Sequence, residues 1–125
     1  MRTPTKHSLS TLAGAAMILA LSACASEKTP ATADVAVSKN AVENAVSAGA
    51  ADLAPAEINL AREKMMRANA ALANKDYALA RDLANQAQAD AKLAQSKANS
   101  AKASAAANAL QEDVRALRDE VERAK

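Results

Sequence analysis

The chain has 125 residues, half of them hydrophobic, and its 16 Lys and Arg against 14 Asp and Glu give a net charge of +2. That length limits it to one small domain, and its single Cys excludes an internal disulfide. The near balance of charge argues against a nucleic-acid partner. The single aromatic residue, Tyr77, excludes the stacking platforms that bind bases or sugars.

The first 24 residues have the pattern of an export signal. Arg2 and Lys6 give a short positive region, and residues 9–21 form an uncharged apolar run that is too short for a permanent membrane span. The tetrapeptide that follows resembles a bacterial lipobox and consists of Leu21, Ser22, Ala23 and Cys24. The resemblance implies that the Cys24 sulfur receives a diacylglycerol and that the chain is cut before it, so residues 1–23 are predicted to be a lipoprotein signal peptide.

Ordinary secretion is the alternative. The sequence Ala23-Cys24-Ala25 also fits the small-residue rule for signal cleavage, which would cut after Ala25 and release a soluble protein. We favour lipidation, because the only cysteine directly follows the apolar run. Two or three acyl chains would hold the protein durably, since each buried methylene contributes about 0.8 kcal/mol. By resemblance to sorting in Gram-negative bacteria, Ala25 after the cysteine implies the periplasmic face of the outer membrane.

Cleavage before Cys24 would change the chemistry of the chain. It removes Arg2, Lys6 and the only histidine, His7, and leaves 14 basic against 14 acidic residues. A neutral surface is not drawn to anionic lipid headgroups, so the lipid is the expected contact with the membrane. Without imidazole or free thiol, the commonest catalytic base and nucleophile are missing. We predict a protein that is not an enzyme and that binds no cofactor and no metal.

The mature N-terminus is predicted to be a tether followed by a short helix. Residues 24–33 show no apolar period and include Pro30, so they are expected to form an extended link. The first helix is expected to begin at Thr32 or Asp34, either of which can cap it, and to end at Gly49. Its apolar period predicts a core-facing stripe of Val35, Val42 and Val46, with Ser38 or Lys39 between them.

A helical hairpin follows the connection at residues 50–54. Pro55 suits the first turn of the second helix, whose apolar stripe is Ile58, Ala61, Met65, Ala68 and Leu72. The next turn is expected at residues 74–77. There Asn74 is expected to take the left-handed conformation and Asp76 to cap the third helix. Tyr77 is expected to pack across the turn on the second helix.

The third helix is predicted to run from Tyr77 to about Ala124, roughly 70 Å. Its first part carries alanines at alternating spacings of four and three, namely Ala80, Ala84, Ala87, Ala91, Ala94, Ala98, Ala101 and Ala105. Such small residues let helix axes approach closely. The pattern then changes phase to a second stripe of Ala103, Ala107, Leu110, Val114, Leu117, Val121 and Ala124. One straight helix cannot present both stripes to the same partner.

The expected fold class is therefore all-α. A short first helix packs on an antiparallel helical hairpin, and the last helix is long and extended. The alanine-rich hairpin domain spans residues 34–102, and residues 103–125 form an amphipathic extension that resembles a coiled coil.

Three motifs in the hairpin resemble a known family: Pro55-Ala56-Glu57, Ala61-Arg62-Glu63-Lys64, and Lys75-Asp76-Tyr77-Ala78-Leu79-Ala80-Arg81. The family is an alanine-rich bacterial lipoprotein family catalogued as a domain of unknown function. Its members typically carry a lipobox, a short first helix and a hairpin, and the domain also precedes OmpA-type peptidoglycan-binding domains. The resemblance covers about Val35 to Lys102 and implies the fold and the envelope location, with no catalytic residue.

Two further resemblances are weaker. Asp76-Tyr77 with Ala80, Ala84 and Ala87 is similar to half of a tetratricopeptide repeat, but one hairpin is not an array. The lipobox cysteine, the alanine-rich helix and Lys125 resemble the Braun-type murein lipoprotein, in which a terminal lysine is joined covalently to peptidoglycan. Braun-type chains are much shorter and lack a hairpin domain.

These observations favour a lipid-anchored cell-envelope protein with a structural or scaffolding role. Its expected partner is another protein or its own copies, bound through a stripe of Leu110, Val114, Leu117 and Val121. One alternative is a Braun-type protein that ties the outer membrane to peptidoglycan through Lys125. The other is a small-ligand or lipid-binding module, which needs a cavity lined by Met65, Met66 and Leu83.

Overall fold

The computed structural model describes the backbone of residues 9–125 and the side chains of residues 27–125. It contains four helices: α1 (Leu9–Ser47), α2 (Ala50–Leu53), α3 (Pro55–Ala73) and α4 (Tyr77–Arg123). This described part of the chain has no strand, so the all-α prediction is confirmed. Residues 1–8, with the predicted positive region of the signal, lie outside the described residues.

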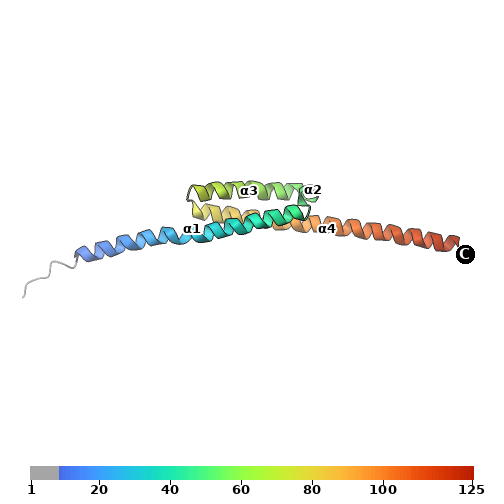
Figure 1. The fold of residues 1–125 in the computed structure, drawn as a ribbon, viewed down its shortest axis with the longest axis horizontal. Helices are drawn as coiled ribbons and strands as arrows, with labels where there is room; N and C mark the ends of the chain where they lie inside the picture. The colour runs from blue at the N-terminus through green and yellow to red at the C-terminus, as the bar shows by residue number, and fades with distance from the viewer. Residues whose placement is uncertain (1–8) are drawn as a thin grey trace, which may run out of the picture.

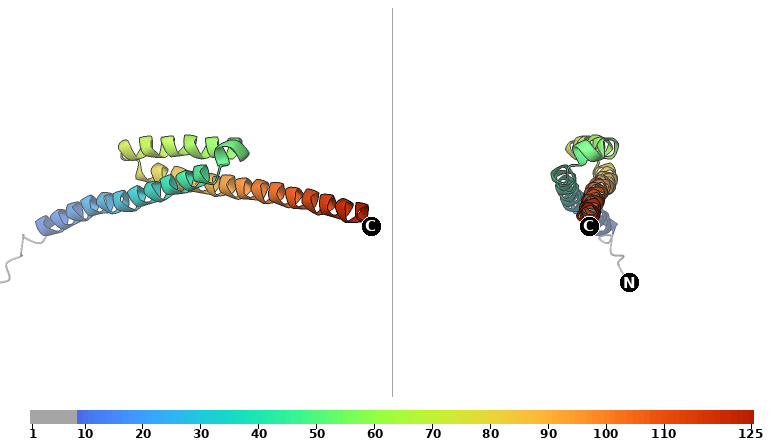
Figure 2. Two further views of the ribbon diagram at one scale, coloured as in Figure 1. Left: turned by 45° about the vertical axis from the view of Figure 1, so that its right-hand side comes forward. Right: turned by 90° about the vertical axis from the view of Figure 1, so that its right-hand side faces the viewer.

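The helices form a three-helix bundle with two projecting ends. α1, α3 and α4 pack side by side, and α3 runs antiparallel to the other two, which share one direction (Figure 1). Viewed along the rod, the three helices occupy the corners of a triangle, with the single turn of α2 beside α3 (Figure 2). α1 and α4 extend past the bundle at opposite ends, which makes the molecule a long, gently curved rod.

The expected extended link at residues 24–33 is wrong, because this segment is part of α1. Pro30 lies inside the helix, and Ala31 is fully buried. Thr32 does not cap a helix start, since its hydroxyl donates to the Lys28 carbonyl 2.9 Å away, one turn back. The high helix propensity of the alanine-rich sequence outweighs the hydrogen bond that Pro30 cannot make. Signal cleavage and the division of the chain at residue 24 stay predictions.

The turn between α1 and α2 depends on Gly49. Its φ of 83° is left-handed, a conformation that glycine adopts without steric cost. Its N–H donates to the Val46 carbonyl at 2.9 Å and closes the end of α1. A Cβ added here would lie 3.3 Å from Lys102 Nζ on α4. The predicted helix end at Gly49 and the predicted helix start at Pro55 therefore agree with the structure.

The turn between α3 and α4 differs from the prediction by one residue. Lys75, and not Asn74, has the left-handed backbone, with φ 62°. Its N–H donates to Leu72 O at 3.1 Å and the Asp76 N–H to Ala71 O at 2.9 Å, the pair of bonds that defines a Schellman motif. Because α3 continues through Ala73, the left-handed position falls on the second residue after it. Asp76 caps α4 as predicted, accepting from the Leu79 N–H at 3.1 Å.

The core consists largely of alanine and falls into two clusters. The first lies toward the turn between α3 and α4 and contains Val35, Met65, Ala68, Ala71, Ala80, Leu83, Ala84 and Ala87. The second lies toward Gly49 and contains Ala45, Ala50, Ala54, Ile58, Ala61, Ala91, Ala94 and Ala98. The predicted stripe of α3 is buried except for Leu72, which is partly buried.

The buried face of α1 and the end of the α4 seam differ from the predictions. On α1, Val35 and Ser38 are buried and Val42 is partly buried, as predicted, but Val46 is 37% exposed and Ala45 is buried in its place. Small side chains therefore occupy the positions at which α1 lies closest to the other helices. On α4 the alanine seam is buried from Ala80 to Ala98 and emerges from the bundle at Ala101, which is partly buried.

Candidate interaction surface

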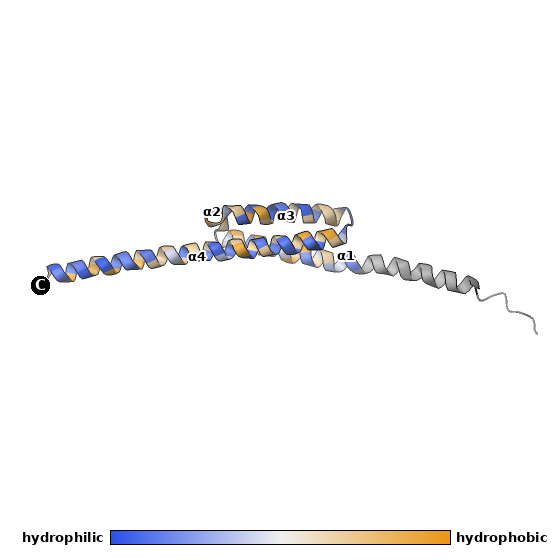
Figure 3. Ribbon diagram, turned by 180° about the vertical axis from the view of Figure 1, so that it is seen from behind, coloured by the Kyte–Doolittle hydropathy of each residue, from blue (hydrophilic) through white to orange (hydrophobic). Residues whose placement is uncertain are grey.

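The exposed end of α4 carries the stripe that the sequence predicts as a contact surface. Every residue from 102 to 125 is exposed. The exposed fractions of its four large apolar side chains are 64% for Leu110, 40% for Val114, 66% for Leu117 and 57% for Val121. Hydrophobic positions recur among hydrophilic ones along the projecting part of α4 (Figure 3). A contiguous apolar surface with a polar rim is typical of interaction sites.

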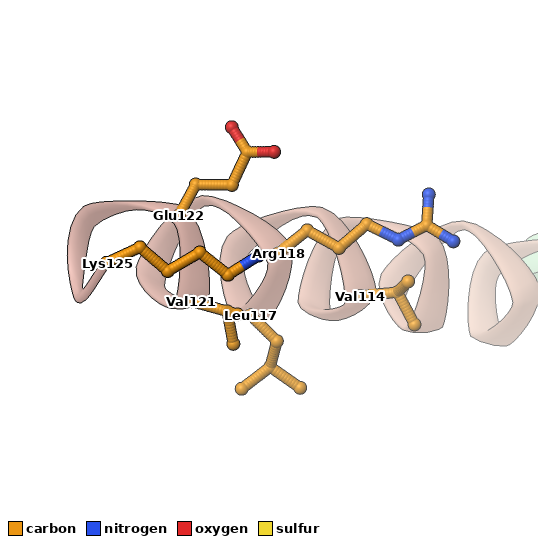
Figure 4. Close-up of a pocket in the computed structure, with 6 residues that line it drawn as sticks. All are labelled: Val114, Leu117, Arg118, Val121, Glu122 and Lys125. Carbon is orange, nitrogen blue, oxygen red and sulfur yellow. The ribbon is translucent and has the colours of Figure 1, made fainter.

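The stripe lies on one open face of a single helix. Leu117 and Val121 point to one side of α4, whereas Glu122 points to the other (Figure 4). The shallow hollow at this place is lined by Val114, Leu117, Arg118, Val121, Glu122 and Lys125, all from the last three turns or just beyond. Because no second element closes the hollow, this surface suits a helix or another extended partner better than an enclosed small molecule.

The stripe also points away from the bundle. Ala98, the last fully buried alanine of the seam, and Ala107 of the stripe are nine residues apart. At about 100° per residue this separation is two and a half turns, so Ala107 lies opposite Ala98 on α4, and by the same count the four large stripe residues lie about 100–160° around the helix from Ala98. Upstream, the same outer face carries Ser96 and Ser100, which line a polar hollow. The apolar stripe therefore starts at Ala103.

Several charged side chains of the bundle form ion pairs between helices. Lys64 Nζ on α3 lies 2.6 Å from Asp90 Oδ2 on α4. Arg81 Nε on α4 donates to Asp34 Oδ2 on α1 at 3.0 Å. These ion pairs join different helices and indicate a structural role. They connect residues too far apart in the sequence for periodicity alone to predict them.

A third ion pair connects Lys97 on α4 to Glu57 in the first turn of α3. The hydrogen bond from Lys97 is the largest cause that lowers the pKa of the Glu57 carboxyl, and a backbone hydrogen bond lowers it further. A negative charge in this first turn is also favourable with the helix dipole.

The three residues expected to line a ligand cavity do not come together. Met65 and Leu83 are buried in the same core cluster, but Met66 is 66% exposed. The hollow that Leu83 reaches lies at the turn between α3 and α4, with Arg67, Asn74 and Leu79. Within residues 27–125, no group of three or more His, Cys, Asp or Glu side chains could hold a metal ion.

The predicted anchor and the stripe belong to opposite ends of the rod. The N-terminal part of α1, which includes the backbone of the lipobox, projects from one end of the bundle, and the far end of α4 projects from the other (Figure 1). The side chains of the lipobox residues Leu21, Ser22, Ala23 and Cys24 do not belong to the part of the chain whose side chains the structure describes. No helix in the described residues has the length and apolar character needed to cross a membrane. Lys125 is exposed just past α4.

A family model described as "Domain of unknown function (DUF4398)" matches residues 33–110. The chain belongs to this family. The DUF4398 match includes the end of α1, all of α2 and α3, and α4 as far as Leu110. Three of the four large stripe residues, Val114, Leu117 and Val121, therefore lie beyond it. No curated protein and no solved structure matches the chain.

Proposed function

We propose that this DUF4398 protein is a lipid-anchored cell-envelope protein with a structural or scaffolding role. Cys24 would hold it at the periplasmic face of the outer membrane, and the stripe of Leu110, Val114, Leu117 and Val121 would contact another protein. The observation that carries the proposal is the projection of α4 beyond the bundle, with these four apolar side chains 40–66% exposed.

The contacts that the helices of the bundle make with one another support this proposal. Its alanine faces are buried, and the three interhelical ion pairs occupy charged groups on α1, α3 and α4. Within residues 27–125, the stripe is an extended apolar surface that these contacts leave uncovered. Each Å² of apolar surface that a partner covers contributes about 25 cal/mol of stabilising free energy. Burial of the exposed leucines and valines would therefore stabilise a complex.

The direction of the helices indicates which end of the protein would face the membrane. Because α1 and α4 run in the same direction and project from opposite ends, an anchor at Cys24 would direct the stripe away from the membrane. A protein of this shape would hold its contact surface at a distance from the lipid. Such an arrangement suits a spacer or scaffold.

Deletion of residues 110–125 tests the contact surface. In cells that make the full chain, we expect chemical crosslinking to capture a partner, and we expect the deletion to abolish that product. The matched control replaces Leu60 and Leu93 with serine, since both are about half exposed on the bundle. Loss of the product in the control, or its persistence after the deletion, would contradict the proposal.

Mass spectrometry of the N-terminal peptide tests the anchor. Lipidation predicts a mature chain that starts at an acylated Cys24 and remains in the membrane fraction. Cys24→Ala is expected to abolish the acyl mass and this processing. A soluble chain starting after Ala25 would instead establish ordinary secretion.

Covalent attachment to peptidoglycan through Lys125 is the second candidate. The observation in its favour is the place of Lys125, exposed at the end of the rod away from α1. Digested cell-wall sacculi would then yield a muropeptide joined to Lys125, which mass spectrometry detects. Absence of that adduct in cells that express the chain would exclude this link.

A further inference from the structure

We infer that the partner of the stripe is a second copy of this chain, bound as a parallel, in-register, two-stranded coiled coil over residues 103–124. The inference rests on the proposed role of the stripe and names its occupant. It depends on two observations: which residue types fill the stripe, and which charges flank it.

The stripe has the heptad composition of a two-stranded coil. Its alternating spacings of three and four make Ala107, Val114 and Val121 the a positions, and they make Ala103, Leu110, Leu117 and Ala124 the d positions. β-branched residues at a with leucine at d favour parallel dimers over larger assemblies. The small residues at both ends leave Leu110, Val114, Leu117 and Val121 as the central contacts.

The flanking charges specify the partner and its direction. The g positions 113 and 120 are Asp and Glu, and the e positions 118 and 125 are Arg and Lys. In a parallel in-register coil, each g residue faces the e residue five positions later on the other helix. Asp113 therefore faces Arg118 of the second copy, and Glu120 faces its Lys125. The symmetry repeats both pairs, which gives four attractive contacts.

The antiparallel arrangement is disfavoured by the same residues. It places g residues opposite g residues and e residues opposite e residues, so Asp113 and Glu120 would meet acids while Arg118 and Lys125 would meet bases. Like charges suppress a wrong pairing. In the single chain, Glu120 Oε2 lies 3.2 Å from Arg123 Nη2, with both side chains about 70% exposed. Exposed pairs of this kind are weak, so Glu120 is available to a second copy.

The shape of the molecule accommodates this dimer. The stripe points away from the side of α4 on which α1 and α3 pack, so the bundles do not occupy the space of the second helix. Polar Ser96 and Ser100 lie on the same outer face, and we expect the apolar coil to end where they begin. A parallel dimer places both copies of α1 at the same end, and thus both Cys24 anchors in one membrane.

Disulfide mapping on the full chain tests the inference. Leu110→Cys and Leu117→Cys are made separately, and membranes of cells producing each variant are treated with copper phenanthroline as oxidant. In a parallel in-register coil each d residue faces its own copy, so both variants are expected to give a disulfide dimer at twice the mass of the single chain. Mass spectrometry then identifies the 110–110 and 117–117 peptides.

Two controls accompany these variants. The parent chain, whose only cysteine is Cys24, shows any dimer that forms without the new thiol. Glu112→Cys places a thiol at an f position, on the outside of the coil, and is expected to give no dimer above that of the parent.

Each outcome decides a different point. Self-disulfides at both 110 and 117 support the inference, whereas a self-disulfide at only one of them indicates an antiparallel pair and overturns it. No self-disulfide at either position overturns the second copy as partner. If deletion of residues 110–125 still abolishes a crosslinked product in that case, the proposed function stands with a different protein as partner. If the deletion changes nothing either, both proposals fail.

Discussion

Ser38 Oγ on α1 lies 2.6 Å from the main-chain carbonyl oxygen of Ala84 on α4, and the Ser38 residue is 1% exposed. The same hydroxyl lies 2.8 Å from Asp34 O within its own helix. A side chain as short as serine can reach the main chain of a neighbouring helix only where the two backbones approach closely. This contact shows how tightly the alanine-rich surfaces bring α1 and α4 together.

Enlarging Ser38 is therefore expected to destabilise the bundle. Ser38→Leu inserts a branched side chain between two backbones and should lower the free energy of unfolding by about 1–3 kcal/mol. Ser38→Ala removes only the hydrogen bond and should cost about 1 kcal/mol. Urea denaturation followed by circular dichroism measures both. The matched control, Lys39→Leu, changes a neighbouring exposed side chain, and an equal loss there would contradict this account of the interface.

Gly49 and Lys75 both have a left-handed backbone. Replacing Lys75 with glycine and Gly49 with alanine should therefore change the free energy of unfolding in opposite directions. Lys75→Gly relieves a non-glycine φ of 62° and should raise the free energy of unfolding by about 1 kcal/mol. Gly49→Ala introduces a Cβ at φ 83° beside Lys102 and should lower it by a similar amount, about 1 kcal/mol. Thermal melts of the two variants test the pair. Stabilisation by Gly49→Ala would contradict the turn geometry.

The Glu57–Lys97 ion pair predicts a stability that depends on pH. The pKa of Glu57 is lower in the folded chain than its ordinary value, so the charged carboxylate stabilises the fold above the ordinary carboxyl range. This contribution is lost as the pH falls through the folded pKa.

Glu57→Gln should accordingly be less stable than the parent at pH 7, and the difference should shrink as the pH falls below about 4. Denaturation at several pH values gives the difference, with Glu112→Gln on the exposed end of α4 as the control for loss of one carboxylate. A difference that stays constant with pH would mean that the Glu57 charge is not responsible.

Charge reversal at Arg118 tests the pairing across the proposed dimer. Arg118→Glu places an acid opposite Asp113 of the second copy, twice in each dimer, and should weaken self-association by roughly a factor of ten. Arg115→Glu makes the same charge change at a b position and should leave association unaltered. Sedimentation equilibrium of the full chain measures the dissociation constants.

The combined variant Asp113→Arg with Arg118→Glu exchanges the two charges and should restore association. Failure of this exchange to rescue the dimer would show that Arg118 acts through something other than its charge partner.

Local signals in the sequence predicted much of the fold. Pro55 and Asp76 act through their own backbones or nearest turns, so their places at helix starts could be predicted from residue chemistry alone. The seam from Ala80 to Ala98 could be predicted because its period is uninterrupted. The projection of α4 could also be predicted, since no Gly or Pro follows Tyr77.

The missed features depend on packing between distant residues. Alanine is common on buried and exposed faces alike, so the end of the α1 stripe was predicted at Val46, whereas Ala45 is buried there. Val35 is buried and Val42 packs against the core, as predicted. The segment around Pro30 has little apolar period, yet it continues α1. The hydrogen bond of Ser38 and the ion pairs between helices require the relative register of the helices, which composition and spacing do not give.

For the interaction surface, the sequence identified the stripe, and the structure added its relation to the bundle. The change of phase at the end of the seam that runs to Ala105 indicated two faces on one helix. The exposure of residues 102–125 and the course of α4 beyond α1 and α3 show that the second face has no partner within the described chain.

Site-specific photocrosslinking in cells that make the full chain tests whether the stripe is a dedicated contact surface. A photoreactive amino acid replaces Leu117 on the stripe in one variant and Asn85, an exposed residue of the bundle part of α4, in the other. A second copy bound at the stripe should give a strong crosslinked product from position 117, containing that copy, and none from position 85. No product from position 117, or equal products from both positions, would contradict a dedicated contact surface at the far end of α4.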